Sequence, residues 1–274
     1  MMQPVELIPG ALDAGVLFIC DHASNHVPAE YGNLGLPASQ FQRHIAYDIG
    51  AAEATRRLAA RFRAPAVLSR FSRLLIDPNR GADDPTLVMR LSDGAVIPGN
   101  AGVDEAEIDR RRRLYWAPYR DAIGATLDAM LARGPVPAIV SLHSFTPLWR
   151  SFARPWRLAV LWDSDPRLAA PLIAALRADG VTVGDNEPYD GALEGDTLYA
   201  MGTARGLPHV LVEFRQDLVE DPIGADAWSR RLGDALSPVL VAPESHMVKY
   251  YESRALRRTR GSGHASRQAD PHRT

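Results

Sequence analysis

The 274-residue chain contains almost no cysteine and almost no lysine. Its one cysteine, Cys20, cannot form an intramolecular disulfide, which excludes cysteine-rich zinc modules and fits a reducing cytoplasm. Lys249 is the only lysine among 31 basic residues, and it lies outside any phosphate-loop or Schiff-base motif. The formal net charge of −2 argues against the strongly basic surface of a nucleic-acid-binding protein.

Long apolar segments are also missing. No apolar run approaches 18 residues, so we expect no membrane-spanning helix. The first ten residues, MMQPVELIPG, lack the basic and apolar regions of a secretory signal. No G-x-S-x-G, H-E-x-x-H, Walker A or Rossmann motif occurs, which argues against several common enzyme classes. We therefore expect a cytoplasmic protein with no nucleic-acid or membrane partner, and the sequence does not indicate its oligomeric state.

What the sequence does contain is an alternation of short apolar runs and helical patterns. Strands are predicted at 15–20, 66–69, 74–76, 138–143, 157–162, 181–183 and 209–214. Helices are predicted at 48–62, from about 104 with a break or kink at Pro118, from Asp165, and at about 224–240. Residues 77–103 and 184–206 are expected to be polar loops.

This order predicts an α/β fold with a mixed, mostly parallel sheet flanked by helices. We expect a single domain over residues 1–256, because no linker interrupts the pattern. Residues 257–274 contain no large apolar residue and are rich in Arg, Ser, Gly and His, which is typical of a disordered basic tail.

Chemically useful side chains follow several predicted strands. His22 follows the first strand and His143 ends the strand at 138–143, while Glu213 lies near the end of the last strand. Because sites in α/β sheets form at the carboxyl ends of strands, we expect these side chains to converge. Two imidazoles with a carboxylate suit a mononuclear zinc hydrolase, although a lone histidine in such a position is often structural. Cys20 is expected to be a buried core thiol.

Eight motifs, in the order CDHASNHVP, HIAYDIGA, SRLLIDPNR, SDGAVIPGN, LHSFTP, RPW, GDNEPY and GLPHVLVEFRQDL, resemble the N-formylglutamate amidohydrolase family. The resemblance covers residues 10–240. It implies a fold similar to that of zinc carboxypeptidases and aspartoacylases, the phosphorylase/hydrolase-like fold. It also implies one Zn²⁺ ion, although iron, cobalt or manganese would accept the same ligands.

The resemblance implies roles for particular residues. The metal ligands would be His22, Asp48 and His143, and the catalytic residues Glu213 as general base and Arg73 near the developing oxyanion. Asn79, Arg80 and Arg215 would bind the carboxylates of an acidic substrate. Each of these residues has a structural alternative: Asp48 as a helix N-cap, and Glu213 or an arginine in an ordinary ion pair.

The chain departs from relatives at two positions. Asn25 stands where relatives place a carboxylate ligand, so Asp48 is predicted to replace it, with Asn25 and His26 as weaker ligand candidates. Met201 stands where many relatives carry histidine, which puts the rate or the specificity in doubt. His44 and Trp149 are weaker candidates for the surroundings of the site.

The expected activity is zinc-dependent hydrolysis of N-formyl-L-glutamate to formate and L-glutamate, with a place in histidine catabolism. One alternative keeps the chemistry and changes the substrate to another N-acyl amino acid or to a carboxypeptidase-like peptide. Another is a non-catalytic binder of acidic metabolites with a degenerate metal site.

Overall fold

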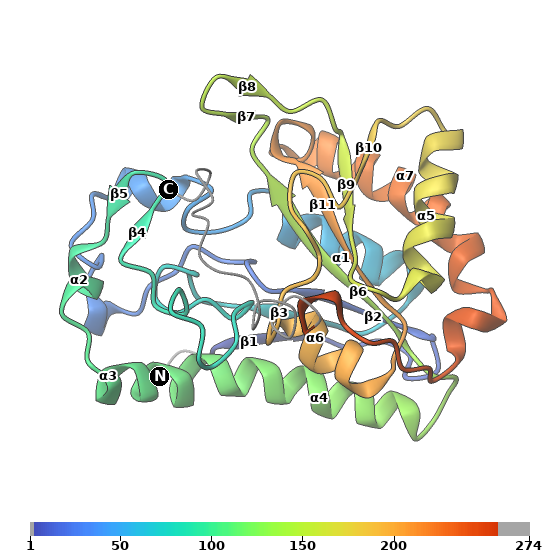
Figure 1. Cartoon of the computed structure of the whole chain (residues 1–274), viewed down its shortest axis with the longest axis horizontal. Coiled ribbons are helices and arrows are strands. Elements are labelled where there is room, and N and C mark those ends of the chain that lie inside the picture. The colour runs from blue at the N-terminus through green and yellow to red at the C-terminus, as the bar shows by residue number, and fades with distance from the viewer. Residues whose placement is uncertain (1–2, 257–274) are drawn as a thin grey trace, which may run out of the picture.

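In the computed structural model, which describes residues 3–256, a seven-stranded sheet forms the centre of the protein (Figure 1). The strand order is β1 (Val5–Ile8), β3 (Ala66–Ser69), β2 (Val16–Cys20), β6 (Ala138–Phe145), β11 (His209–Arg215), β9 (Leu158–Leu161) and β10 (Val183–Asp185). The pairings β1–β3 and β9–β11 are antiparallel, and the other four are parallel. The predicted mixed, mostly parallel sheet is therefore confirmed.

Helices cover both faces of this sheet. On one face, side chains such as Phe18 and Cys20 pack in a core with α1 (Ala51–Phe62), α5 (Pro166–Ala178) and α7 (Pro222–Leu240). On the other face, Leu17 and Ile19 pack with α4 (Ala117–Leu131), which lies along the lower side of Figure 1. Because the central strands are buried on both faces, apolar residues predominate in them, as the run VLFIC of β2 and the start AIV of β6 show. Cys20 is buried, as expected.

One predicted strand is wrong. Leu74, Leu75 and Ile76 are fully buried, but their backbone forms turns rather than a strand. Distant side chains satisfy the carbonyl groups that a sheet neighbour would otherwise bond: Asn100 Nδ2 donates to Leu74 O and Arg111 Nη1 donates to Leu75 O. An apolar run can thus be buried without extended backbone when polar side chains complete its hydrogen bonds.

The two segments expected to be loops contain short elements. Between residues 77 and 103 lie the hairpin β4 (Leu91–Ser92) and β5 (Ala95–Val96) and the helix α2 (Pro98–Ala101). The second segment contains the end of β10 and α6 (Thr197–Met201). The sequence prediction also missed β1 and the exposed hairpin of β7 (Leu148–Trp149) and β8 (Phe152–Ala153).

The long helix does not end at Pro118. It begins as α3 (Glu105–Arg111), where Asp104 Oδ1 accepts a hydrogen bond from the Glu107 amide, and it continues into α4. A π-helical turn, η3 (Arg112–Trp116), lies directly before Pro118. A wider turn of this kind is a regular way to accommodate an irregularity inside a continuous helix.

Among residues 3–256, no helix has both the length and the apolar character needed to cross a membrane. The predicted disordered tail, 257–274, lies outside the described residues.

Gly50 determines how the chain enters α1. Its φ of +81° is left-handed, and a Cβ atom at this position would lie 2.3 Å from the Val219 carbonyl oxygen. Only glycine meets both conditions. The close approach fixes the segment that carries Asp48, two residues earlier, against the chain that follows β11.

We expect Gly50→Ala to lower the free energy of unfolding by about 3 kcal/mol, because left-handed strain adds to an overlap with backbone. Gly180→Ala is the matched control, since Gly180 has a similar φ of +74° but a Cβ there would meet no atom within 4 Å. The control should cost only about 1 kcal/mol. Urea denaturation of both variants measures the difference, and equal losses would contradict the close approach at Gly50.

Candidate active site

Three neighbouring parallel strands bring the candidate side chains to one edge of the sheet. His22 lies two residues beyond the end of β2, while His143 lies within β6. Glu213 lies within β11, directly opposite His143 in the parallel pairing of β6 and β11. All three residues are buried. The predicted convergence of these side chains at one sheet edge is therefore present in the structure.

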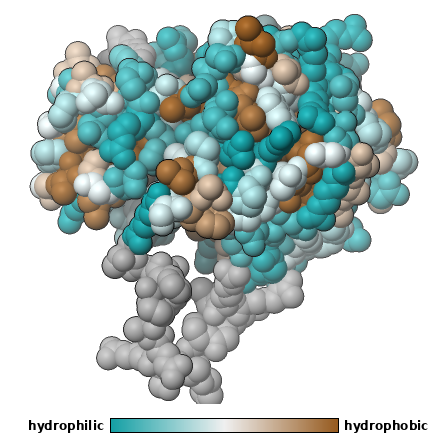
Figure 2. Space-filling model, turned by 90° about the horizontal axis from the view of Figure 1, so that it is seen from above, coloured by the Kyte–Doolittle hydropathy of each residue, from teal (hydrophilic) through white to brown (hydrophobic). Residues whose placement is uncertain are grey.

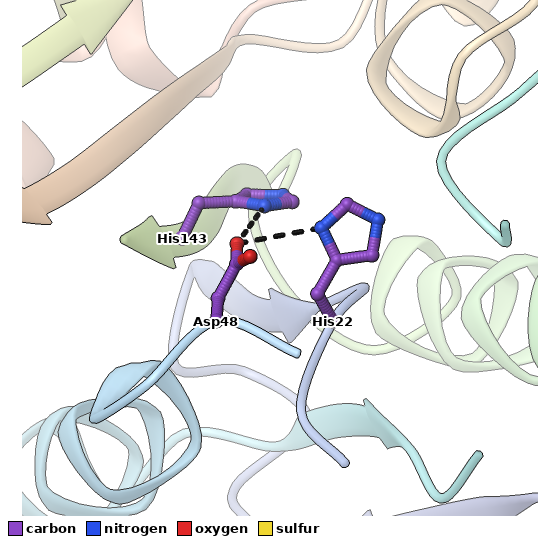
Figure 3. A group of neighbouring side chains, drawn as sticks. All are labelled: His22, Asp48 and His143. Carbon is purple, nitrogen blue, oxygen red and sulfur yellow. Dashed lines mark hydrogen bonds and ion pairs between the residues drawn. The ribbon is translucent and has the colours of Figure 1, made fainter. Parts of the chain in front are cut away.

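Asp48 lies between the two histidines (Figure 3). Its Oδ2 atom is 3.3 Å from His22 Nδ1 and 2.8 Å from His143 Nδ1. Each of the three residues offers one potential ligand atom, and these three atoms all lie within 4.8 Å of one another. The N-cap of α1 is Gly50, so the side chain of Asp48 does not cap the helix and belongs instead to this buried group. Two imidazole nitrogens and a carboxylate oxygen are a donor set that could hold a metal ion.

The opposite nitrogen of each imidazole contacts a further carboxylate. His22 Nε2 is 2.7 Å from Asp77 Oδ1, and His143 Nε2 is 3.1 Å from Asp21 Oδ2. These contacts fix the orientation of both rings and leave the two Nδ1 atoms facing Asp48. The same arrangement is common around metal-binding histidines, where a carboxylate accepts the second ring proton.

The buried charges shift the acidities of these groups strongly. Burial opposes the ionisation of Asp48, but the two imidazoles outweigh it and hold the pKa of that carboxyl well below its usual range. Burial also disfavours the charged form of His143, yet hydrogen bonds to Asp21 and Asp48 raise its pKa to about 10. Without a metal ion, the cluster therefore keeps His143 protonated at neutral pH.

Glu213 behaves differently from the other carboxylates. Burial raises its pKa to about 7, and the nearby His143 only partly offsets this effect. Its Oε2 atom is buried and has no hydrogen-bond partner among residues 3–256. A buried carboxyl with a near-neutral pKa and an unsatisfied oxygen can accept or donate a proton at neutral pH.

A cavity of about 380 Å³ is lined by the four central residues of the site, His22, Asp48, His143 and Glu213. Its wall also contains four other residues singled out from the sequence: Arg73, Asn79, Arg80 and His44. Arg73 Nη2 donates to Asp77 Oδ2 at 3.0 Å, and its Nη1 atom is 3.5 Å from Asp48 Oδ1. This arginine therefore lies beside the histidine–aspartate group rather than in a surface ion pair.

Hydrogen bonds to backbone groups and to one side chain hold Asn79 and Arg80 in place. Asn79 Oδ1 accepts a hydrogen bond from the Thr197 amide at the start of α6. Arg80 Nη1 donates to the Asn79 carbonyl, and its Nε donates to Thr86 Oγ1. Both side chains reach the cavity wall from the segment after β3.

Several other candidates lie away from the cavity. Arg215 binds both oxygens of Asp217 and donates to the Arg154 carbonyl, so it does not line the cavity. Asn25 donates to the Phe41 carbonyl, and His26 is exposed. Met201 packs against the hydrophobic core on the α4 face of the sheet.

Asp21 and Asp77 were assigned no role from the sequence. Both stand beside assigned residues, in the motifs CDHASN and LLIDPN, so the signal was present. Their function depends on which imidazole nitrogen they contact, which the sequence does not specify. Thr197 was also missed: its hydroxyl donates to Asp21 Oδ1 at 2.6 Å and thereby supports the carboxylate behind His143.

A model of the family described as N-formylglutamate amidohydrolase matches residues 14–220. The gene product Atu2144 from Agrobacterium tumefaciens is 33% identical, with a TM-score of 0.83 over 87% of this chain and 95% of that one. N-formylglutamate amidohydrolase from Ralstonia eutropha JMP134 is 20% identical, with a TM-score of 0.65 over 87% of this chain and 98% of that one. No curated protein matches the chain.

The raised pKa of Glu213 predicts a pH-dependent stability difference in metal-stripped protein. Between its ordinary value of 4.5 and about 7, the folded state keeps a proton that the unfolded state has lost, so this group makes stability fall as pH rises. The Glu213→Gln variant has no ionisable group at this position, so its stability does not fall with pH for this reason. Its stability relative to the parent should therefore increase between pH 5 and 7.5, by on the order of 3 kcal/mol.

Urea denaturation of both proteins across this pH range measures the effect. A difference that does not change with pH would mean that Glu213 titrates at its ordinary pKa.

Proposed function

Because this chain belongs to the N-formylglutamate amidohydrolase family, we propose that it is a zinc-dependent hydrolase of N-formyl-L-glutamate or a similar small N-acyl amino acid. One observation carries the proposal: His22, Asp48 and His143 form a compact buried group beside Glu213, whose Oε2 atom has no hydrogen-bond partner in the described part of the chain. This group lines a cavity that also contains arginine side chains, as an acidic substrate requires.

The donor set fits a bound Zn²⁺ ion. The ion would be held by His22 Nδ1, His143 Nδ1 and Asp48 Oδ2, and three protein ligands are the usual number in a catalytic zinc site. Asp77 and Asp21 would keep the opposite ring nitrogens protonated and so direct the ligating nitrogens inward.

The charge of the group supports a divalent cation. Asp21, Asp48 and Asp77 are all buried, and Arg73 is the cation that contacts two of them. Metal ligation requires both imidazoles to be neutral, and in that state the three carboxylates exceed this guanidinium by two charges. Excess buried charge is costly, and a dipositive ion balances it.

When bound, the ion would lower the pKa of a water molecule and polarise the substrate carbonyl. Glu213 is the residue placed to move the proton. Its unpartnered Oε2 accepts a proton from the attacking water, and the same carboxyl then gives it to the departing amine. The water oxygen bonds to the acyl carbon and the C–N bond breaks, which yields a carboxylic acid and a free amino acid.

The arginine side chains give the cavity its preference for an acidic substrate. Arg80 and Asn79 offer donors to a substrate carboxylate, and the planar guanidinium can make two parallel bonds to it. Arg73 lies close enough to Asp48 to act on negative charge that develops beside the histidines.

The direct test is formate release from N-formyl-L-glutamate by purified protein. We expect turnover, its loss after treatment with a chelator, and its recovery when zinc is added back. Iron, cobalt and manganese should be tested in the same add-back series, because this donor set also accepts them.

Bound zinc without formate release would move the substrate to another acyl amino acid. Neither bound metal nor turnover would contradict the metal-dependent mechanism and favour a binding protein.

Glu213→Gln should reduce turnover by about 10²- to 10⁴-fold, because the amide cannot accept the proton of the attacking water. Metal content, measured by elemental analysis, should not change, since Glu213 is not among the proposed ligands. Glu220→Gln is the matched control: Glu220 is exposed and follows the same strand, so this variant should retain full activity. Equal activity of the two variants would rule out Glu213 as the general base.

A further inference from the structure

An aromatic groove lies beside the catalytic cavity. Its volume is about 430 Å³, and its lining is mainly aromatic or apolar: Trp149, Phe152, Arg154, Trp156, Glu187, Pro188 and Tyr189. Trp149 and Phe152 come from the β7–β8 hairpin, which projects from the upper edge of the molecule (Figure 1). Figure 2 looks onto this side and shows separate hydrophobic patches in a largely hydrophilic surface.

The aromatic rings of the groove are unusually exposed. The exposed fractions are 39% for Trp149, 57% for Phe152 and 45% for Tyr189. Trp149 and Phe152 are directly opposite each other in the hairpin, so both side chains project from the same face. Leaving large rings in water is unfavourable, and apolar clusters of this kind mark binding sites.

The groove and the cavity share a wall. Tyr189 lines both spaces. The buried guanidinium of Arg154 donates to the Tyr189 hydroxyl at 2.9 Å and to the Thr146 carbonyl and hydroxyl. It also lies against the rings of Phe145, in the cavity wall, and Trp149, in the groove. Arg154 therefore fixes the two lining surfaces relative to each other.

The order of the strands in the sheet predicts which end of a substrate would lie in the cavity and which end in the groove. Along the sheet edge, the segment with Asn79 and Arg80 follows β3. His22 follows β2, His143 belongs to β6, and Glu213 belongs to β11. The groove is built from segments next to β9 and β10, further along in the same order. A substrate whose carboxylate meets Arg80 and whose amide lies beside Glu213 would extend its acyl group towards the groove.

We propose that the groove binds a bulky apolar acyl group, so that the favoured substrates are arylacyl or long-chain acyl derivatives of an acidic amino acid. This inference rests on the proposed amide hydrolysis and extends it to a substrate class. A formyl group is too small to reach the groove. The rings of the lining suit a neutral aromatic or alkyl group, and the lining's one cation, Arg154, and one anion, Glu187, leave it without net charge to attract a charged group.

The test compares N-phenylacetyl-L-glutamate with N-formyl-L-glutamate, which differ only in the acyl group. For the zinc-loaded protein, we expect a KM about tenfold lower for the phenylacetyl compound. Trp149→Ala and Phe152→Ala should remove this advantage and leave the kinetics of the formyl compound unchanged. Leu148→Ala is the matched control, because Leu148 is on the same hairpin, is 54% exposed and does not line the groove.

A binding measurement separates this inference from the proposed function. Calorimetric titration of both compounds into Glu213→Gln protein, alone and combined with Trp149→Ala, reports occupancy of the groove without turnover. Groove-dependent binding of the phenylacetyl compound supports the inference even if neither compound is hydrolysed, in which case only the proposed hydrolysis fails. Hydrolysis of the formyl compound with no preference for the phenylacetyl group, or a preference that survives both groove substitutions, overturns the inference alone.

Discussion

A single carboxylate oxygen, Asp48 Oδ2, lies within hydrogen-bond distance of both imidazoles in the buried cluster. This contact requires a particular orientation of both imidazole rings and a particular position of the Asp48 backbone. The ring nitrogens that face Asp48 must be presented on the same side, which Asp77 and Asp21 achieve from behind. Asp48 itself must be carried to the centre of the sheet edge, which depends on the bond from its amide to the His22 carbonyl and on the close approach of Gly50 to Val219.

The sequence predicts the central strands well because they are buried on both faces and contain apolar runs, VLFIC in β2, AIV in β6 and VLV in β11. It predicts the start of α5 from Asp165, whose side chain caps the helix. It fails at residues 74–76, where the same kind of apolar run is buried as turns. The difference lies in Asn100 and Arg111, which donate hydrogen bonds to the buried carbonyl groups of Leu74 and Leu75 from far along the chain. A local pattern carries no information about such distant partners.

In the candidate site, too, the sequence pattern does not predict contacts between distant side chains. Strand ends and family resemblance together single out His22, Asp48, His143 and Glu213, and the structure brings all four side chains to one cavity. Arg215 shares a strand face with Glu213 by sequence parity, yet its guanidinium turns to Asp217. The roles of Asp21 and Asp77 follow only from the orientation of the imidazole rings. Residue type and strand position are thus readable from sequence, whereas the direction of a long or rotatable side chain depends on its neighbours.

The position of β11 has a consequence for synthesis of the protein. This strand is the last of the sheet in the sequence, yet it lies between β6 and β9, which are both made earlier. While residues 209–215 are still inside the ribosome, β6 and β9 have no partner on their facing edges, and unpaired edges of this kind attract other chains. At this stage both histidines and Asp48 have already left the ribosome, whereas Glu213 has not. The same strand therefore closes the sheet and adds Glu213 to the buried group of His22, Asp48 and His143.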